Sequence, residues 1–312
     1  MTFKKRLLRF IGIVDPEDEK KKPQTIKEKI IEFFKQFGYA AIAALFIITF
    51  IIQNTRIPTG SMEGTILVGD FVIVNKFIYG ASSPRYIPFT EVALPFFTLP
   101  SVKEPERGDI VVFEYPGDRD LIKPTELNLN YVKRLIGMPG DTIEIRNRII
   151  YVNGKENHIP PYVQYAARQS TPKGIVNPDI FPPGKQWNED NYGPLWVPKE
   201  GSSVQLSLEN INEWRTTINR EFGEDVVTVR NGKILIQDKE VTSYTFKKDH
   251  YFMIGDNRNN SLDSRFWGYV PRDLVVGQAF LVLFSWDREI PFSKIFKLIA
   301  SIRTDRILKL ID

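Results

Sequence analysis

The chain has 312 residues, of which 42% are hydrophobic, so it can bury the core of one large domain or of a domain with an insert. Its 42 Lys and Arg stand against 38 Asp and Glu, and because the two signs are largely interspersed, the charge of +4 does not predict a nucleic-acid partner. The absence of cysteine excludes thiol proteases, thiolate metal sites and disulfides, and two histidines leave little room for zinc. We expect no metal and no cofactor.

The N-terminal part of the chain changes from basic to apolar. Ten Lys and Arg fall within residues 1–37, and an uncharged run from Gly38 to Ile52 follows. The run is shorter than the ~20 residues that cross a bilayer, but three nearby phenylalanines extend its apolar character. We predict a basic tail over 1–37 and a transmembrane helix over 38–54; a buried core helix is the alternative.

The residues on either side of this run predict its orientation and its retention. A cleaved export signal would end at a small-residue site, which Gln53 to Arg56 does not provide, so we expect the helix to remain in the protein. Because ten cations precede the helix and only Arg56 follows it closely, the N-terminus is expected in the cytoplasm. Everything after Ile52 is then extracytoplasmic.

After Arg56 the apolar residues alternate with polar ones, which is typical of half-buried strands. Pro-Gly, Asn-Gly and Gly-Asp pairs separate the runs. The pattern predicts a mainly β protein with strands over 71–74, 109–113, 131–136, 142–152, 226–236, 251–254 and 279–284.

The alternation fades over 157–225, where Pro, Gly, Tyr and Trp accumulate. This predicts an inserted subdomain that divides a β-domain into the parts 55–156 and 226–288. Helical spacing within the insert predicts one helix, with Ser207 as its N-cap and Gly223 as its stop. The C-terminal tail, 289–312, is predicted to be an amphipathic helix that docks on the domain or lies on a membrane surface.

Few residue types could serve as a nucleophile and base in this chain. Without cysteine and with almost no histidine, the candidates reduce to serine or threonine with a lysine base. Ser61 follows a glycine just beyond the apolar run, although a simple turn would have the same pattern. Lys133 lies within a predicted strand on the same face as Tyr131 and Leu135, where burial would lower its pKa; a lysine extending to the solvent at a strand edge is the alternative.

Two further segments flank predicted strands. Residues 255–268 are rich in polar groups directly after the apolar run 251–254, so we expect internal hydrogen bonding there. Residues 105–113 predict a turn that leads into a buried strand, and we expect them to have a structural role only.

Four segments, 57–70, 105–113, 131–141 and 255–268, in this order after an N-terminal span, resemble the bacterial signal peptidase I family. The resemblance runs from about Arg56 to Phe284 through these motifs and does not cover the insert or the tails. It implies a signal peptidase I-like β-domain with an inserted cap subdomain and one N-terminal transmembrane helix. It also implies a single-pass enzyme of the bacterial cytoplasmic membrane that removes signal peptides from exported preproteins after small residues, with the lipid bilayer as a second partner.

The resemblance also implies a role for each matching residue. Ser61 would be the nucleophile and Lys133 its general base, as a Ser-Lys dyad. Ser261 would orient the lysine amine, and the Thr59 hydroxyl would share the oxyanion hole with the Ser61 backbone N–H. Asp263 and Arg265 would form a structural ion pair near the site. The substrate pocket would be formed by Ile57, Pro58, Met62, Tyr131 and Val132.

Several points remain open at this level. Gly64 stands where many family members have proline, which we expect to loosen the turn after the nucleophile. The apolar segment 86–100 is expected to dip into the bilayer or to pack on the core. The rival functions are a self-cleaving Ser-Lys regulator of the LexA type, a noncatalytic membrane-anchored peptide-binding β-domain, and a histidine-based triad that uses His250.

Overall fold

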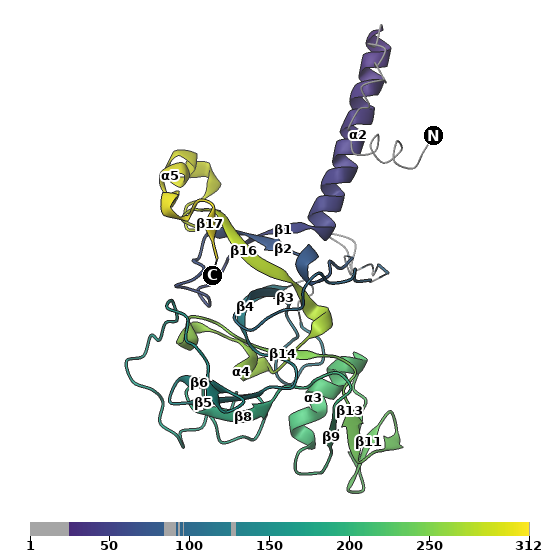
Figure 1. Ribbon diagram of the computed structural model, residues 1–312, viewed down its shortest axis with the longest axis vertical. Coiled ribbons are helices and arrows are strands. Elements are labelled where there is room, and N and C mark those ends of the chain that lie inside the picture. The colour runs from purple at the N-terminus through teal and green to yellow at the C-terminus, as the bar shows by residue number, and fades with distance from the viewer. Residues whose placement is uncertain (1–24, 84–91, 93, 96, 126–128, 312) are drawn as a thin grey trace.

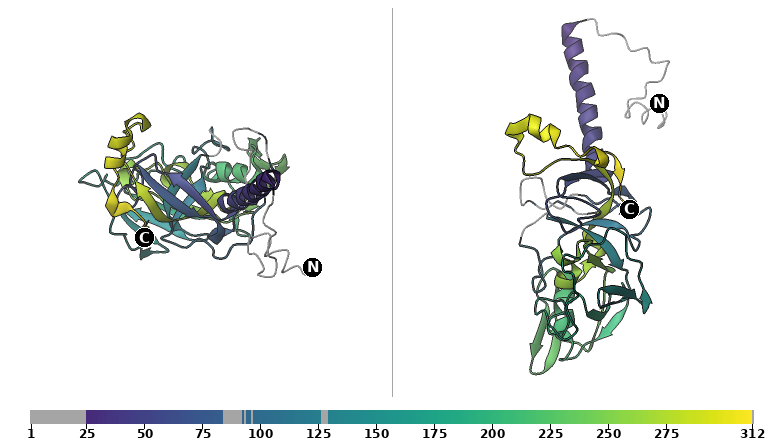
Figure 2. Two further views of the ribbon diagram at one scale, coloured as in Figure 1. Left: turned by 90° about the horizontal axis from the view of Figure 1, so that it is seen from above. Right: turned by 90° about the vertical axis from the view of Figure 1, so that its left-hand side faces the viewer.

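A long helix stands away from an elongated, β-rich body (Figures 1 and 2). The computed structural model describes residues 25–83, 92, 94–95, 97–125 and 129–311. Residues 1–24 of the predicted basic tail and most of the segment 86–100 therefore lie outside the described residues.

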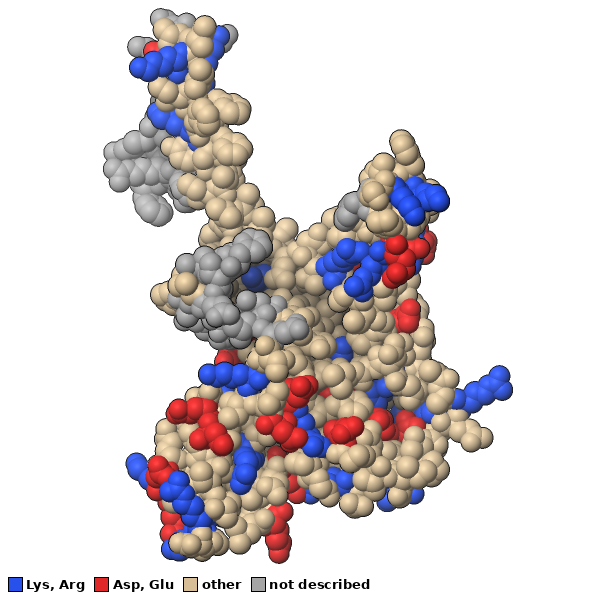
Figure 3. All heavy atoms as spheres, turned by 180° about the vertical axis from the view of Figure 1, so that it is seen from behind, with Lys and Arg blue, Asp and Glu red and all other residues tan. Residues whose placement is uncertain are grey.

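Helix α2 (Ile26–Phe50) is the only long apolar helix among the described residues, and it contains an 18-residue window of mean hydropathy 1.6. Thr25 begins it with a capping box to Glu28, and none of its residues is buried. Its 25 residues span about 37 Å, enough for the hydrocarbon core of a bilayer. Figure 3 shows its charged side chains toward the far end, while the half next to the body is uncharged.

The helix differs in extent from the predicted span, 38–54. It begins earlier, at Ile26, and it ends at Phe50 because strand β1 (Ile52–Arg56) follows at once. β1 pairs with β2 (Asp70–Asn75), so residues 52–54 have their hydrogen bonds in a sheet and the predicted end at 54 is wrong.

An eight-stranded antiparallel sheet forms the part of the body next to α2. Its order is β1-β2-β16-β3-β4-β14-β15, and β17 also pairs with β16. The remaining strands of this sheet are β3 (Ile110–Glu114), β4 (Asn130–Gly137), β14 (His250–Ile254), β15 (Val270–Pro271), β16 (Val275–Ser285) and β17 (Lys309–Leu310). The strands predicted over 71–74, 109–113, 131–136, 251–254 and 279–284 are confirmed.

Both faces of this sheet are covered, because alternate residues of β3 enter two different clusters. Ile110 and Val112 pack with Val72 on one face, while Val111 and Phe113 pack with Leu135 on the other. The sheet thus holds buried side chains on both sides, which gives β4 a dry environment near its middle.

Smaller sheets form the far end of the body. The order β7-β6-β5-β8 makes one sheet, β10-β11-β12 another, and β9 pairs with β13. Their bounds are β5 (Thr142–Arg146), β6 (Ile149–Val152), β7 (Lys155–Glu156), β8 (Tyr192–Trp196), β9 (Ser203–Gln205), β10 (Val227–Arg230), β11 (Lys233–Ile236), β12 (Lys239–Glu240) and β13 (Ser243–Thr245). The strands predicted over 142–152 and 226–236 are therefore hairpins.

The predicted insert, 157–225, shares its core with its neighbours in sequence. Strand β8 lies within it but pairs with β5, and one apolar cluster joins Ile143, Ile180, Trp214 and Ile234. The predicted boundaries at 156/157 and 225/226 therefore cut through a common sheet and core.

Helix α3 (Ile211–Phe222) is the helix predicted within the insert. Gly223 ends it at φ 75°, as predicted. The predicted N-cap is wrong: Asn210 occupies that position, and Ser207 lies in the preceding turn, where its backbone N–H donates to the Asn210 side chain at 2.8 Å.

The C-terminal tail is not one amphipathic helix. A short turn (Phe292–Lys294) leads into α5 (Ile295–Ala300), after which the Arg303 N–H bonds to the Ser285 carbonyl and β17 returns to the main sheet. The tail is held by Arg306, which is buried against Asp70. Of the predicted membrane-dipping segment, Phe97 is described, and its ring stacks on Phe50 at the end of α2.

Candidate active site

Ser61 lies in a turn between β1 and β2 that is fixed on both sides. Ile57 and Asp70 close the base of the loop with a hydrogen bond of 2.9 Å. Met62, the next residue, is buried and accepts a backbone hydrogen bond of 2.8 Å from Ile66. Because the chain is anchored directly after the serine, its hydroxyl is presented at the surface of a pocket while its backbone cannot drift.

The Lys133 side chain reaches Ser61 from β4. Its Nζ lies 2.7 Å from the Ser61 Oγ and 3.1 Å from the Val132 carbonyl oxygen. Lys133 is 1% exposed, and no carboxylate of the described residues forms an ion pair with it. The amine therefore lies in a dry environment with a hydroxyl as its nearest side-chain partner.

This environment changes the acid-base behaviour of the amine. Burial lowers the pKa of Lys133 from 10.5 to about 8, and the Asp263 carboxylate opposes this shift to a smaller extent. About a tenth of the amine is then neutral at pH 7, whereas an ordinary lysine would be neutral in less than about one molecule in a thousand. A neutral Nζ can accept the proton that the Ser61 hydroxyl donates across 2.7 Å.

A pocket of about 160 Å³ opens beside these two groups. It is formed by the segment that follows β1 and by the start of β4, and its walls include buried apolar side chains. Every residue predicted for the substrate pocket or the oxyanion hole lines it: Ile57, Pro58, Thr59, Ser61, Met62, Tyr131 and Val132.

The predicted ion pair lies behind the dyad. Asp263 and Arg265 are fully buried and joined by two parallel hydrogen bonds of 2.8 and 2.9 Å. Burial alone would raise the pKa of Asp263, but the Arg265 charge and its hydrogen bonds hold it below the usual range. The carboxylate also accepts the Gly255 N–H at 3.1 Å, so the pair fixes the loop after β14.

Ser261 is brought to the site, but the predicted hydrogen bond to Lys133 is not formed. Its Oγ is buried and has no hydrogen bond of normal geometry, although it lies close enough to Asp263 to contribute to that carboxylate's lowered pKa. The reason for its position is Gly255: a Cβ there would lie 2.2 Å from the Ser261 Oγ and 2.5 Å from the Ser61 carbonyl oxygen. Only glycine lets these two segments approach so closely.

Two residues that support the turn around Ser61 were not predicted. The Asn257 N–H donates to the Ser61 carbonyl at 3.1 Å, and its side chain donates to the Gly60 carbonyl at 3.0 Å. Asp256, fully buried, receives Thr65 at 2.6 Å and the Arg134 guanidinium at 2.8 Å. The many polar residues of 255–268 indicated that hydrogen bonds form there. The sequence does not indicate which residues Asp256 and Asn257 bind.

Gly64 has a different role from the one expected. Its φ is +102°, and a Cβ would lie 2.3 Å from the Tyr162 carbonyl oxygen. Proline, whose φ is fixed near −65°, cannot adopt this conformation. The glycine does not loosen the turn; it permits a tight contact with the segment around Tyr162.

The two histidines lie outside the pocket. His250 is buried between the rings of Phe246 and Tyr269, and burial lowers its pKa to about 4. Its Nδ1 is 3.0 Å from the Lys248 carbonyl oxygen. His158 is exposed, and within the described ranges no group of three or more His, Cys, Asp or Glu is placed to hold a metal ion.

The chain is similar to known proteins over most of its length. The family model "Signal peptidase, peptidase S26" matches residues 30–286. Signal peptidase I of Buchnera aphidicola (Acyrthosiphon pisum) is 33% identical over 285 residues, which are 86% of this chain and 79% of the relative. Signal peptidase I of Rickettsia typhi is 30% identical over 304 residues, which are 94% of this chain and 96% of the relative.

One more relative and one solved structure are also similar to this chain. Signal peptidase I of Pseudomonas aeruginosa is 30% identical over 82% of this chain and 73% of the relative. A crystal structure of a signal peptidase I from Enterococcus faecalis covers 57% of this chain and 98% of its own, at 23% identity and a TM-score of 0.28. The matching family model and the relatives of about 30% identity over most of the chain show that the protein belongs to the signal peptidase I family of serine peptidases, peptidase S26.

Proposed function

We propose that this chain is a membrane-anchored endopeptidase that removes signal peptides from exported preproteins, with Ser61 as nucleophile and Lys133 as general base. The observation that carries the proposal is the 2.7 Å between Nζ and Oγ in a buried environment where the lysine pKa is about 8. A weak nucleophile needs an adjacent base, and a desolvated lysine supplies one near neutral pH.

The substrate would bind as an added strand. β14 pairs with β4 from Arg134 onward, and the edge formed by residues 130–133, before this pairing, borders the pocket. An extended peptide can lie between this edge and residues 57–59. Its scissile carbonyl would then be placed at Ser61.

The proposed reaction has two steps. Lys133 accepts the Ser61 proton as Oγ bonds to the carbonyl carbon, and the oxyanion is stabilised by the Ser61 N–H and the Thr59 hydroxyl. The protonated amine then donates to the leaving nitrogen, the peptide bond breaks and an ester remains. Lys133, neutral again, takes a proton from water as the water attacks the ester, and Ser61 regains its proton.

We assign Ser261 to orienting the lysine amine. Its Oγ is buried, forms no hydrogen bond of normal geometry, and lies beside the Ser61 carbonyl across Gly255. A hydroxyl there can accept a hydrogen bond from the amine once the Ser61 oxygen is committed to the substrate.

The pocket favours small side chains. Its volume is about 160 Å³, and Ile57, Met62 and Val132 in its walls are buried and packed. Large substrate side chains would require these residues to move, which a close-packed core resists. We therefore propose cleavage after small residues of the Ala-x-Ala type.

Anchoring follows from α2. It is unburied, apolar and long enough to span a bilayer, and its charged residues lie in its N-terminal half. With the cations of residues 1–37 on the cytoplasmic side, the body would face the extracytoplasmic side, where exported preproteins emerge.

The test is cleavage of a model preprotein by the detergent-solubilised full chain. Ser61→Ala and Lys133→Ala should each lower the rate about a thousandfold or more, because members of a catalytic unit fail together. Lys103→Ala, which removes a partly exposed lysine paired with Glu106, is the matched control and should cleave normally. Substantial cleavage by either dyad variant would refute the assignment.

A serine-reactive peptide inhibitor separates the rival functions. The proposal predicts a covalent adduct on Ser61 that is absent in Ser61→Ala, whereas a peptide-binding domain without activity would give none. A preprotein with leucine in place of alanine before the cleavage site should be a poor substrate. A self-cleaving regulator would instead process its own chain and ignore the preprotein.

A further inference from the structure

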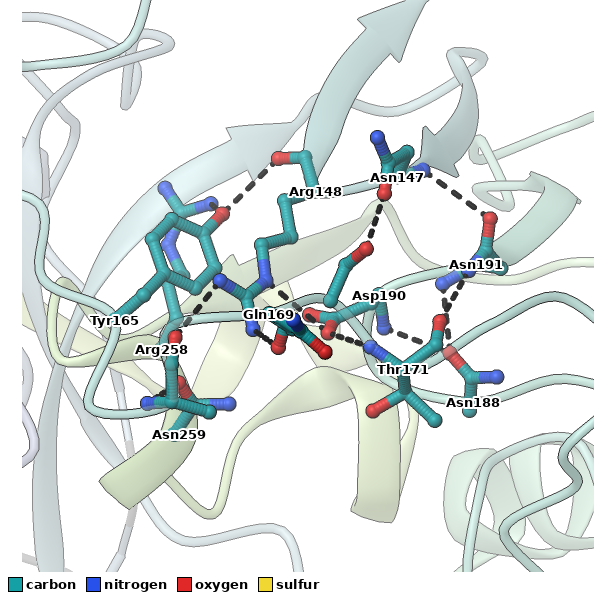
Figure 4. Close-up of polar contacts among 12 residues, drawn as sticks. Asn147, Arg148, Tyr165, Gln169, Thr171, Asn188, Asp190, Asn191, Arg258 and Asn259 are labelled. Atoms are coloured by element: carbon teal, nitrogen blue, oxygen red, sulfur yellow. Dashed lines mark hydrogen bonds and ion pairs between the residues drawn. The ribbon is translucent and has the colours of Figure 1, made fainter.

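Arg148, at the tip of the β5–β6 hairpin, holds a loop that belongs to a different part of the chain (Figure 4). Its guanidinium lies 3.1 Å from the Asp190 carboxylate, donates to the Ala167 carbonyl at 2.9 Å and donates to the Gln169 carbonyl. The side chains of Arg148 and Asp190 are 14% and 2% exposed. One planar guanidinium thus binds a carboxylate and two backbone carbonyls in a largely desolvated setting.

Tyr165, in the same loop, is held between two arginines. The Arg148 Cζ lies 4.6 Å from the centre of its ring, and the Tyr165 hydroxyl donates to the Arg148 carbonyl at 3.0 Å. From the other side, Arg258 donates to the same hydroxyl at 3.3 Å and is itself 4% exposed. Figure 4 shows the tyrosine hydroxyl between the two arginines. Tyr165 therefore joins the β5–β6 hairpin to the loop after β14.

The loop continues from Tyr165 to the nucleophile turn. The Gln164 N–H donates to the Asp256 carbonyl at 2.8 Å, and its carbonyl accepts the Arg258 N–H at 2.9 Å. Between these two bonds lies Asn257, whose N–H donates to the Ser61 carbonyl at 3.1 Å. Two backbone hydrogen bonds, from Gln164 to Asp256 and from Asn257 to Ser61, therefore connect this loop to the residue that carries the reactive hydroxyl.

The loop needs such side-chain contacts in order to stay in place. Residues 157–191 contain no strand or helix, and their regular backbone pairing is limited to isolated bridges such as that of Gln164 with Asn257. Segments with few regular backbone bonds open most easily. Tyr162, in the same loop, nevertheless lies against Gly64 so closely that a Cβ there would be 2.3 Å from its carbonyl oxygen. The loop thus lies tightly against the turn that carries Ser61.

We propose that Arg148 and Tyr165 are positioning residues for the cleavage reaction. By clamping residues 162–169 against the loop after β14, they fix Asn257 and, through it, the position of Ser61 relative to Lys133. This inference rests on the proposed function, in which Ser61 is the nucleophile. It gives the segment 157–191 a role in the rate of reaction, with no direct contact to the substrate.

The test compares Arg148→Met with Arg146→Ala in the detergent-solubilised full chain. Arg146 is on the same hairpin but is exposed, and its contacts are with Glu144 and the Tyr151 ring of that hairpin, so its loss should leave cleavage unchanged. Arg148→Met should lower kcat about 10- to 100-fold, because a displacement of about 1 Å in a catalytic group has effects of this size. KM should stay within about twofold, because the pocket beside β4 is not touched.

Two readouts separate positioning from a loss of folded protein. The serine-reactive inhibitor is titrated to its endpoint to count the active molecules, and kcat is then expressed per titrated site. The proposal predicts that kcat per titrated site is still lower in Arg148→Met than in the wild type. If kcat per titrated site equals that of the wild type, the clamp is only structural and the inference is wrong. The kcat of Arg148→Lys should lie between those of the wild type and Arg148→Met, since lysine keeps the charge beside Asp190 but lacks the planar guanidinium.

Tyr165→Phe serves if Arg148→Met does not fold. It keeps the ring between the arginines and removes only the hydroxyl, and we expect kcat to fall about fivefold with little change in thermal stability. Unchanged kcat in this variant would overturn the inference. Ser61→Ala in the same series distinguishes failure of the proposed function from failure of this inference. Full activity of Ser61→Ala would refute the proposed function. An inactive Ser61→Ala together with fully active Arg148→Met and Tyr165→Phe would refute the positioning role alone.

Discussion

Replacing Lys133 by methionine should make the folded protein more stable at pH 7, and the gain should shrink as the pH rises. Methionine has nearly the same length and fills the same space but cannot be charged. In the wild type, burial lowers the folded-state pKa of Lys133 from 10.5 to about 8, so at pH 7 the fold must hold a protonated amine that is 1% exposed. That unfavourable burial is absent in the variant.

The magnitude follows from the two pKa values. Because the unfolded chain binds the proton more tightly than the fold, wild-type stability rises with pH between about 8 and 10.5 and is flat below that range. The full effect is about 3 kcal/mol, most of which falls between pH 7 and pH 10. The advantage of Lys133→Met over the wild type should therefore decrease by about 2–3 kcal/mol between these two pH values.

Urea unfolding of the detergent-solubilised chain, followed by tryptophan fluorescence, measures this difference. α2 contains no tryptophan, so the signal reports on the body, where Trp267 and Trp214 are buried. Buried tyrosines also titrate at high pH, but they are common to both proteins and cancel in the comparison. A stability difference that does not change with pH would mean that the amine keeps an ordinary pKa, and the reasoning would be wrong.

Three further substitutions test other parts of the account. Gly64→Pro should abolish cleavage or lower the thermal midpoint strongly, since φ is +102° and the Tyr162 carbonyl occupies the space; normal cleavage and stability would contradict the assigned geometry. His250→Phe should cleave within about twofold of the wild type, and a folded but inactive variant would point to histidine as the base. Arg306→Met should cost about 3–5 kcal/mol in urea unfolding because it leaves Asp70 buried without its cation, and unchanged stability would show that the pair is unimportant.

The strands were predictable because their signals are local. The alternation in 71–74 and 109–113 identifies a buried face within a few residues, and the structure has β2 and β3 there. Lys133 in an apolar strand was likewise a local signal for a perturbed amine. Its partner Ser61, 72 residues away, was paired with it only through the resemblance to a family.

The supporting ion pairs could not be predicted in the same way. Arg134 and Asp256 are 122 residues apart, and Asp70 and Arg306 are 236 apart. Each of these residues has an ordinary local interpretation as a solvated charge, and only the register of β4 with β14 and the return of the tail to β16 bring the partners together. The end of α2 was missed for a similar reason: the apolar pattern continues through Ile52, but pairing with Asn75 of β2 overrides it.

The most direct measurement is the titration of the Lys133 amine itself. Lysine labelled with ¹³C at Cε and ¹⁵N at Nζ gives one signal for this residue, which is assigned by its absence in Lys133→Met. We predict a titration midpoint of about 8, retained in Ser61→Ala because burial is the main cause of the shift. A midpoint near 10.5, together with that of the exposed lysines, would contradict the account.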